Sequence, residues 1–401
     1  MNSETRALAS IATCHGLVHV LELAYGALLV GIASEFGASL FVMGVMANIF
    51  GLAFGFTALP SGFLADRIGE KRLLVVCCLV SGMAAAGVGF ANSIYTLGAA
   101  LLVLGLGLGL YHPAGAAFIA KTGHRTGMAF GYLGVGGNLG LALAPVIVGS
   151  IAAVSNWRAA YTLLSIPMVL LAAAFAFGLR GARPVEREAS PSGVAGTSRR
   201  RATVASLSLI LTAQLLNGFI YRGVVTFLPL YLGQSVAQVS SESGLMFLAG
   251  SVTTVVLLFG VGGQFFGGYL SERVRPEMLA LAVCLGSFPL LIAVGASQGL
   301  LLVVITCAFA VFHFMGQPVF NVLVSGYSPV TWRGRVFGFS FFCNFGLGSF
   351  SAGMLGYVAD RAGLNWVFTA ASGFAMLALA AVLVLLFRYG GMGTESGARW
   401  Y

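Results

Sequence analysis

The sequence predicts an all-α integral membrane protein whose twelve transmembrane helices form two pseudo-symmetric six-helix halves. Composition is the first reason: 58% of the 401 residues are hydrophobic, 8% are charged, and the mean hydropathy is +0.95. So few charges cannot cover a water-facing surface, and most of the exterior must therefore face lipid. The second reason is the number of long apolar runs, and the third is a loop signature that occurs twice.

Twelve apolar runs are long enough to cross a bilayer, which takes roughly 20 residues. Six precede a polar stretch and six follow it, near residues 9–32, 41–63, 73–92, 97–120, 128–151, 159–179, 205–232, 244–270, 278–296, 299–326, 335–358 and 364–388. The chain thus divides into a first half over 1–179, a cytoplasmic linker over 180–204, and a second half with a short cytoplasmic tail over 205–401. The linker mixes Pro, Gly, Ser and Arg without periodicity, as flexible linkers do.

Basic residues indicate the orientation. If the N-terminus is cytoplasmic, inner segments hold 18 of the 21 Lys and Arg residues, whereas Arg158 and Arg361 lie outside and Arg222 lies within a span. The positive-inside rule describes this asymmetry. We therefore expect a multi-pass protein of the bacterial inner membrane with both termini cytoplasmic, and no nucleic-acid partner despite the net charge of +9.

The doubled loop signature reads GFLADRIGEKR at 62–72 and GYLSERVR at 268–275, so that Gly62 and Gly268 are 206 positions apart. Nearly the same offset relates Pro113 to Pro318, Asn138 to Asn344 and Gly140 to Gly346. Two similar halves in a membrane protein are typical of a transporter whose site lies between them.

At these residues the chain resembles the major facilitator superfamily, whose most diagnostic motif is similar to the first loop copy. The resemblance implies that the two loops gate transport through Gly62, Asp66, Arg67, Gly69, Lys71, Arg72, Gly268, Glu272 and Arg273. Glycine allows close approach and a turn, and Asp66 would contact a helix N-terminus or a basic neighbour at the cytoplasmic seam. The second copy has Glu272 in place of Asp66, so we expect the weaker gate there. A role of the basic residues in topology alone stays open.

A glycine-proline pattern in the fifth span resembles a motif common in antiporters of this superfamily, and it departs from that motif at Ala144. Its members are Gly131, Gly140, Pro145 and Gly149. Small residues let membrane helices approach closely, and proline bends a helix. The His-rich first span and the stretches YHPAG and RGVVTFLPLYL are similar to fosmidomycin-resistance-type efflux proteins. The arginine that drug antiporters typically carry early in span four is absent.

Two charged residues, Glu22 and Arg222, lie near the middle of spans, in spans one and seven. A buried ionisable group there costs roughly 3 kcal/mol or more and is usually paired or functional. Pseudo-symmetry makes these two spans equivalent and places both beside a central cavity. The two residues either form a structural pair or bind substrate and protons in that cavity.

A polar face in the first span supports proton binding. His15, His19 and Glu22 lie within about 60° of one another on a helix, and imidazole titrates near neutrality. Further candidate cavity residues are His112, Asn138, His313, Gln317 and Asn344. Each histidine could instead be a hydrogen-bonded packing residue. Because no second ligand cluster accompanies these histidines, we expect no metal site.

The function expected from these features is secondary active transport. No nucleotide-binding loop is present, so the energy must come from a gradient. We predict proton-coupled efflux, by antiport and alternating access, of a small amphiphilic or anionic organic compound. Proton-coupled uptake of an organic anion is the alternative, and a non-transporting receptor or scaffold is more remote. We expect a monomer in contact with membrane lipid that is not an enzyme and needs no cofactor.

Overall fold

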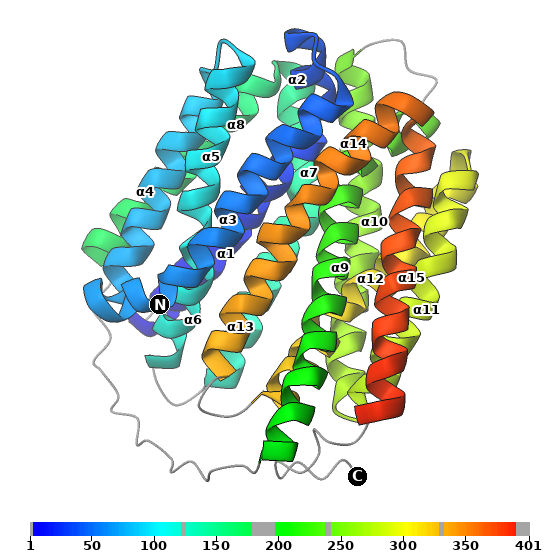
Figure 1. The fold of residues 1–401 in the computed structure, drawn as a ribbon. Coiled ribbons are helices and arrows are strands. Elements are labelled where there is room, and N and C mark those ends of the chain that lie inside the picture. Colours follow the sequence, from blue (N-terminus) through cyan, green and yellow to red (C-terminus); the bar gives the residue numbers. More distant parts are fainter. Residues whose placement is uncertain (1–2, 122–125, 179–196, 237–241, 329–332, 390–401) are drawn as a thin grey trace.

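The computed structural model describes residues 3–121, 126–178, 197–236, 242–328 and 333–389. Within these ranges every regular element is a helix, and twelve helical segments are long and apolar enough to cross a membrane. Figure 1 shows them as one bundle, in which α9 begins and α15 ends at the lower end while α2 lies at the upper end, called here the α2 end. The predicted fold class is confirmed.

In its described residues the first half contains eight α-helices, and its last span ends in a π-helical turn. The elements are α1 (Ser3–Ala27), α2 (Leu29–Phe36), α3 (Leu40–Ile68), α4 (Glu70–Gly89), α5 (Ile94–Gly109), α6 (Tyr111–Lys121), α7 (Thr126–Val154), α8 (Trp157–Ala173) and η1 (Ala174–Gly178). Figure 1 shows α3, α4 and α5 on the left of the bundle.

The second half has one span, the eleventh, that changes helix type along its length. Its elements are α9 (Thr197–Val236), α10 (Glu242–Ser271), α11 (Pro276–Ala296), α12 (Gly299–Tyr327), α13 (Arg333–Phe341), the π-helix η2 (Phe342–Gly346), the 3₁₀-helix η3 (Leu347–Ser349), α14 (Phe350–Ala362) and α15 (Leu364–Tyr389). Helix α9 begins at Thr197, inside the stretch predicted as linker; residues 179–196 lie outside the described ranges.

Three predicted spans are interrupted. The first span stops at Ala27 and continues as the separate helix α2. The fourth breaks at Leu110, and Pro113, three residues later, has no N–H to bond back to the preceding turn. The eleventh widens into η2, where glycines bring its backbone against α3 and α9: Gly55 lies against Gly346, and Gly218 lies against Asn344.

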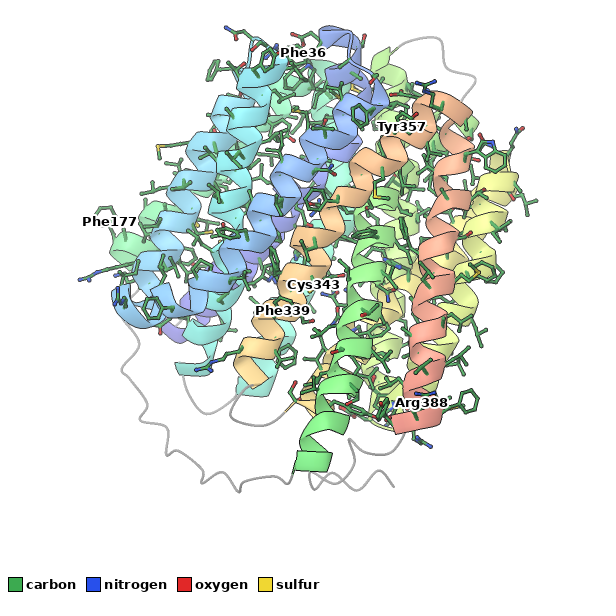
Figure 2. The ribbon with its side chains drawn as sticks, in the orientation of Figure 1. Phe36, Phe177, Phe339, Cys343, Tyr357 and Arg388 are labelled. Carbon is green, nitrogen blue, oxygen red and sulfur yellow. The ribbon has the colours of Figure 1, made fainter. Side chains whose placement is uncertain are left out.

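Glycines also set the close helix contacts elsewhere in the bundle. Gly16 of α1 lies against Gly140 of α7, so a methyl group on either would meet backbone atoms of the other. Gly44 of α3 similarly faces the backbone of Ala352 in α14. Lipid is as apolar as the helices and gives no hydrophobic driving force for their association, so small residues contribute by letting the helices pack closely. Some large apolar side chains point outward: Phe177 is 91% exposed and projects from the edge of the bundle in Figure 2.

Candidate functional site

The two charges that lie mid-span form a buried pair between the halves. Glu22 of α1 is 2% exposed and Arg222 of α9 is 3% exposed. Arg222 Nη2 donates a hydrogen bond to Glu22 Oε1 over 3.2 Å, and Tyr221 Oη donates to the same oxygen over 3.4 Å. The carboxylate of one half is therefore held by two groups of the other.

Arg222 also reaches the third helix of the opposite half. Its guanidinium carbon lies 5.5 Å from the ring centroid of Phe50. A Cβ atom on Gly51 would lie 3.3 Å from Arg222 Nε, so this glycine leaves room for the guanidinium. Arg222 Nε is buried and has no hydrogen-bond partner in the described structure.

A histidine relay runs from the same carboxylate along α1. Glu22 Oε2 lies 2.8 Å from His19 Nδ1, and His19 Nε2 lies 3.1 Å from His15 Nε2. His15 Nδ1 then contacts the backbone oxygen of Leu133 in α7 at 2.8 Å. The predicted polar face of the first span is thus a continuous chain of hydrogen bonds.

The hydrogen-bond chemistry of this relay implies one shared proton. A carbonyl oxygen only accepts, so His15 Nδ1 carries hydrogen and, in the neutral ring, His15 Nε2 accepts from His19. His19 Nδ1 then either accepts from a protonated Glu22 or, in the imidazolium form, donates to an ionised Glu22. Both arrangements hold the same number of protons. They differ only in the position of one proton, which is either on the Glu22 carboxyl group or on His19 Nδ1.

His112 of α6 joins this cluster from a third helix. Its ring centroid lies 5.2 Å from that of His15 and 5.5 Å from that of His19. The ligand nitrogens of the three histidines lie within 4.8 Å of one another, which is a spacing that could hold a metal ion. Two of these nitrogens, His19 Nε2 and His15 Nε2, share a hydrogen bond, and the expectation of no metal site stays a prediction.

The remaining predicted cavity residues lie outside this cluster. His313 of α12 stacks on Tyr221 with centroids 6.3 Å apart, and its buried Nδ1 has no partner in the described structure. Gln317 is exposed and hydrogen bonds to Gln264 of α10. The two predicted asparagines lie on α7 and in the eleventh span. Asn138 follows Gly137, which packs on the His15 ring, and Asn344 lies in η2.

A polar seam that sequence reasoning missed joins the halves at the α2 end. Both carboxylate oxygens of Asp360, near the end of α14, accept hydrogen bonds from the first turn of α3: Leu40 N at 2.9 Å and Phe41 N at 2.8 Å. A carboxylate at a helix N-terminus is favourable because the free N–H groups carry partial positive charge. Farther along the seam, Asn48 Oδ1 accepts from Gly353 N at 3.0 Å. The halves are thus fastened at this end.

The two loop signatures share one local geometry. The guanidinium carbon of Arg67 lies 4.5 Å from the Phe63 ring centroid, and that of Arg273 lies 3.6 Å from the Tyr269 ring centroid. The predicted turn is present at Gly69, whose φ is +86°.

The other gating predictions are open or untested. Gly62 and Gly268 have no atom near enough to show close packing in this conformation. Lys71 is half-buried, and Arg72 and Glu272 are exposed. The side chain of Asp66 and the surroundings of Gly131 lie outside what the structure describes, so the Asp66 contact stays a prediction.

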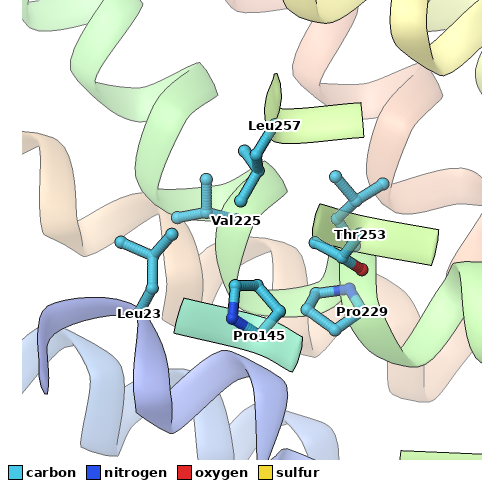
Figure 3. A pocket seen from close by; sticks show the side chains of 7 residues that line it. Leu23, Pro145, Val225, Pro229, Thr253 and Leu257 are labelled. Carbon is cyan, nitrogen blue, oxygen red and sulfur yellow. The ribbon is translucent and has the colours of Figure 1, made fainter. Parts of the chain in front are cut away.

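The glycine-proline pattern of α7 lies along close helix contacts. Gly140 faces Gly16 of α1, while a Cβ atom on Gly149 would lie 2.8 Å from Met246 O in α10. Pro145 lines a small pocket with Pro229 of α9, as Figure 3 shows. The other lining residues are Leu23, Val225, Leu228, Thr253 and Leu257. This pocket is apolar apart from one threonine, and we assign it no substrate.

Comparison with known proteins places the chain in a transporter family. The family model described as Major Facilitator Superfamily matches residues 11–353, and the chain belongs to this superfamily. It is therefore a secondary transporter and not an enzyme. The crystal structure of a bacterial homolog of the human lysosomal transporter Spinster, in an inward-facing and unoccupied conformation, has a TM-score of 0.79 at 16% identity and covers 96% of this chain and 97% of that one.

Several relatives are named for what they transport or confer resistance to, and two of them illustrate the range. The probable sulfoacetate transporter SauU of Cupriavidus necator is 27% identical over 263 residues, which is 61% of this chain and 59% of that protein. The multidrug resistance protein MdtG of Escherichia coli is 27% identical over 257 residues, 62% of each chain. Both matches span less than two thirds of the relative.

Proposed function

We propose that the chain carries a small organic anion across the membrane together with a proton, at a site centred on Glu22 and Arg222. The observation that carries this proposal is the buried pair itself, held between the halves at 3.2 Å with a histidine relay ending on the same carboxylate. An anion that binds Arg222 must first displace Glu22. That step leaves a buried carboxylate without its cation, which is costly unless the carboxylate is neutralised.

The shared proton can neutralise it. When the proton is on His19, Glu22 is ionised and holds Arg222. When the proton moves to Glu22, Arg222 is released to bind an anion, and His19 is free to be protonated again. Proton binding and anion binding therefore promote one another, and this coupling is reciprocal. In an alternating-access carrier, mutually promoted binding favours symport, which gives uptake when the proton gradient points inward.

The seam between α3 and α14 supplies the gate in this proposal. Most basic residues are expected at the opposite end of the bundle, so we place the α2 end on the outer side with both termini in the cytoplasm. Asp360 then closes the outer side in this structure, and Asp66 is its proposed counterpart on the cytoplasmic side.

Efflux by proton antiport is the second candidate. A cationic or amphiphilic substrate that pairs with Glu22 would compete with the proton, so the charge of the substrate decides the sign of coupling. The relative named multidrug resistance protein MdtG and the glycine contacts of α7 favour this candidate. The narrower resemblance to fosmidomycin-resistance-type proteins stays a prediction.

Calorimetry distinguishes the two candidates. Binding of sulfoacetate to the purified protein is measured in buffers of different ionisation enthalpy, which reports protons taken up or released. Symport predicts proton uptake on anion binding, loss of binding in Arg222→Gln, and binding without proton uptake in Glu22→Gln. Proton release on binding would support antiport, and binding that Arg222→Gln leaves intact would contradict the proposed site.

A further inference from the structure

A cluster of aromatic rings from both halves lies beside the Glu22–Arg222 pair. We call it the aromatic cluster; its members are Phe54, His112, Tyr221, Phe341 and Phe345. Phe54 and His112 belong to the first half and the other three to the second. Phe54 lies 5.7 Å from Phe345, and His112 lies 5.0 Å from Phe341, measured between ring centroids. The rings therefore meet at the surface along which the halves must separate during transport.

Arg222 borders this cluster on the polar side. Its guanidinium carbon lies 5.8 Å from the Tyr221 ring centroid, and the Tyr221 ring meets Phe345 edge-on at 5.7 Å. Arg222 Nε and His112 Nε2 are both buried and have no hydrogen-bond partner in the described structure. Buried polar atoms are nearly always hydrogen-bonded. Two unsatisfied ones on residues that contact the aromatic cluster indicate a place for a polar ligand group.

The backbone that carries Phe345 is unusual. Phe345 lies in the π-helix η2, and π-helical turns occur frequently at functional sites. Glycines let this turn lie directly between α3 and α9, against Gly55 on one side and Gly218 on the other. Movement of one half against the other therefore shifts the Phe345 ring relative to Phe54, which belongs to the first half.

We infer that Arg222 and the aromatic cluster form a binding site for an aromatic carboxylate, with its carboxylate on Arg222 and its ring among the cluster rings. This inference rests on the proposed function and adds a substrate class to it. When the halves separate, Phe54 and His112 lose their partners across the interface, and the ring of the substrate replaces those contacts. A saturated ring of similar size buries similar area but lacks the edge and face interactions of an aromatic pair.

The test compares benzoate with cyclohexanecarboxylate, which share a carboxylate and a six-carbon ring. Dissociation constants are measured by calorimetry on the full-length protein in nanodiscs, with benzyl alcohol as the uncharged analogue. The wild type should bind benzoate roughly tenfold more tightly than cyclohexanecarboxylate if two aromatic contacts form. Benzyl alcohol should bind at least as weakly as the saturated acid.

Substitutions locate the preference. Phe345→Leu should remove the difference between the two acids while leaving the affinity for cyclohexanecarboxylate within about twofold. Phe339→Leu is the matched control, because Phe339 lies on α13 and is 47% exposed (Figure 2). Its selectivity should equal that of the wild type. If Phe345→Leu fails to fold, the wild-type affinities for benzoate and cyclohexanecarboxylate still test whether the site prefers an aromatic ring.

The outcomes separate this inference from the proposed function. Equal affinity of the wild type for both acids, or binding of sulfoacetate alone, overturns the aromatic site while Arg222-dependent anion binding still stands. Absence of Arg222-dependent binding of any of these anions overturns the proposed function and the aromatic site together. Selectivity that persists in Phe345→Leu and falls in Phe339→Leu overturns the location.

Discussion

Replacing Arg222 by glutamine should destabilise the protein by an amount that depends on His19. Breaking a buried ion pair by removing one partner typically costs about 3–5 kcal/mol, because the other charge is left buried. Here Glu22 keeps a 2.8 Å contact with His19 and can take the shared proton from it. The loss should then fall to that of a hydrogen bond to a charged group, about 1.5–3 kcal/mol.

Combining Arg222→Gln with His19→Gln removes the proton donor that neutralises Glu22. Glutamine at position 19 cannot deliver a proton to Glu22, so the double variant should lose about 3–5 kcal/mol through the unpaired carboxylate. His19→Gln alone leaves Glu22 paired with Arg222, so it should cost about 0.5–1 kcal/mol, the loss of one hydrogen bond. The double variant should therefore be less stable than the sum of the single effects predicts by about 1 kcal/mol, against an additivity error of about 0.5 kcal/mol. Arg361→Gln is the control, because Arg361 is exposed.

The assay is a double-mutant cycle on the purified protein in one detergent. Unfolding of the wild type, Arg222→Gln, His19→Gln and the double variant is followed by circular dichroism as denaturant is added, at the pH used for binding. Additive effects would refute the proton exchange between His19 and Glu22. An Arg222→Gln variant as stable as the wild type would refute the claim that the ion pair is a buried interaction between the halves.

Two further predictions concern the α2 end. Asp360→Asn weakens a carboxylate–helix interaction of about 0.3–1 kcal/mol, so the population with this end open should rise about two- to fivefold. Spin labels at Phe90 and Leu300, which are exposed on opposite halves, should then report longer distances. An unchanged distance distribution would contradict the role of the seam as a gate. A hydrogen bond from Arg158 lowers the pKa of Glu35 below its ordinary value, so the stability it contributes is fully present above that ordinary value, near pH 4.3, and is lost as pH falls through the depressed folded value. The melting-temperature gap between wild type and Glu35→Gln should hold above about pH 5 and shrink in more acidic buffer; a gap that widens on acidification would contradict this.

Hydropathy was sufficient to predict the spans because the bilayer core accepts only helices with long apolar runs. It did not predict the breaks within them. The π-helix at Phe342–Gly346 depends on Gly55 and Gly218, residues on other helices that meet it only in the folded bundle. The break between α1 and α2 is likewise absent from the pattern, because both segments are apolar.

The centre of the site could be predicted because charge is rare within spans. Glu22 and Arg222 stood out for that reason, and helical periodicity placed His15 and His19 on the face of Glu22. The partners of Asp360 could not be found in this way. These partners are backbone N–H groups of the first half. In the sequence, an acidic residue at the end of a span has the same pattern whether water or backbone N–H groups bind its carboxylate.

Proton movement on anion addition tests the central claim most directly. The protein is reconstituted into liposomes that contain a pH-sensitive dye, and sulfoacetate or benzenesulfonate is added outside, since neither crosses lipid as a neutral acid. The account predicts internal acidification with the wild type and none with Glu22→Gln or Arg222→Gln. Internal alkalinisation, acidification that Glu22→Gln retains, or no Arg222-dependent change with either anion would contradict it.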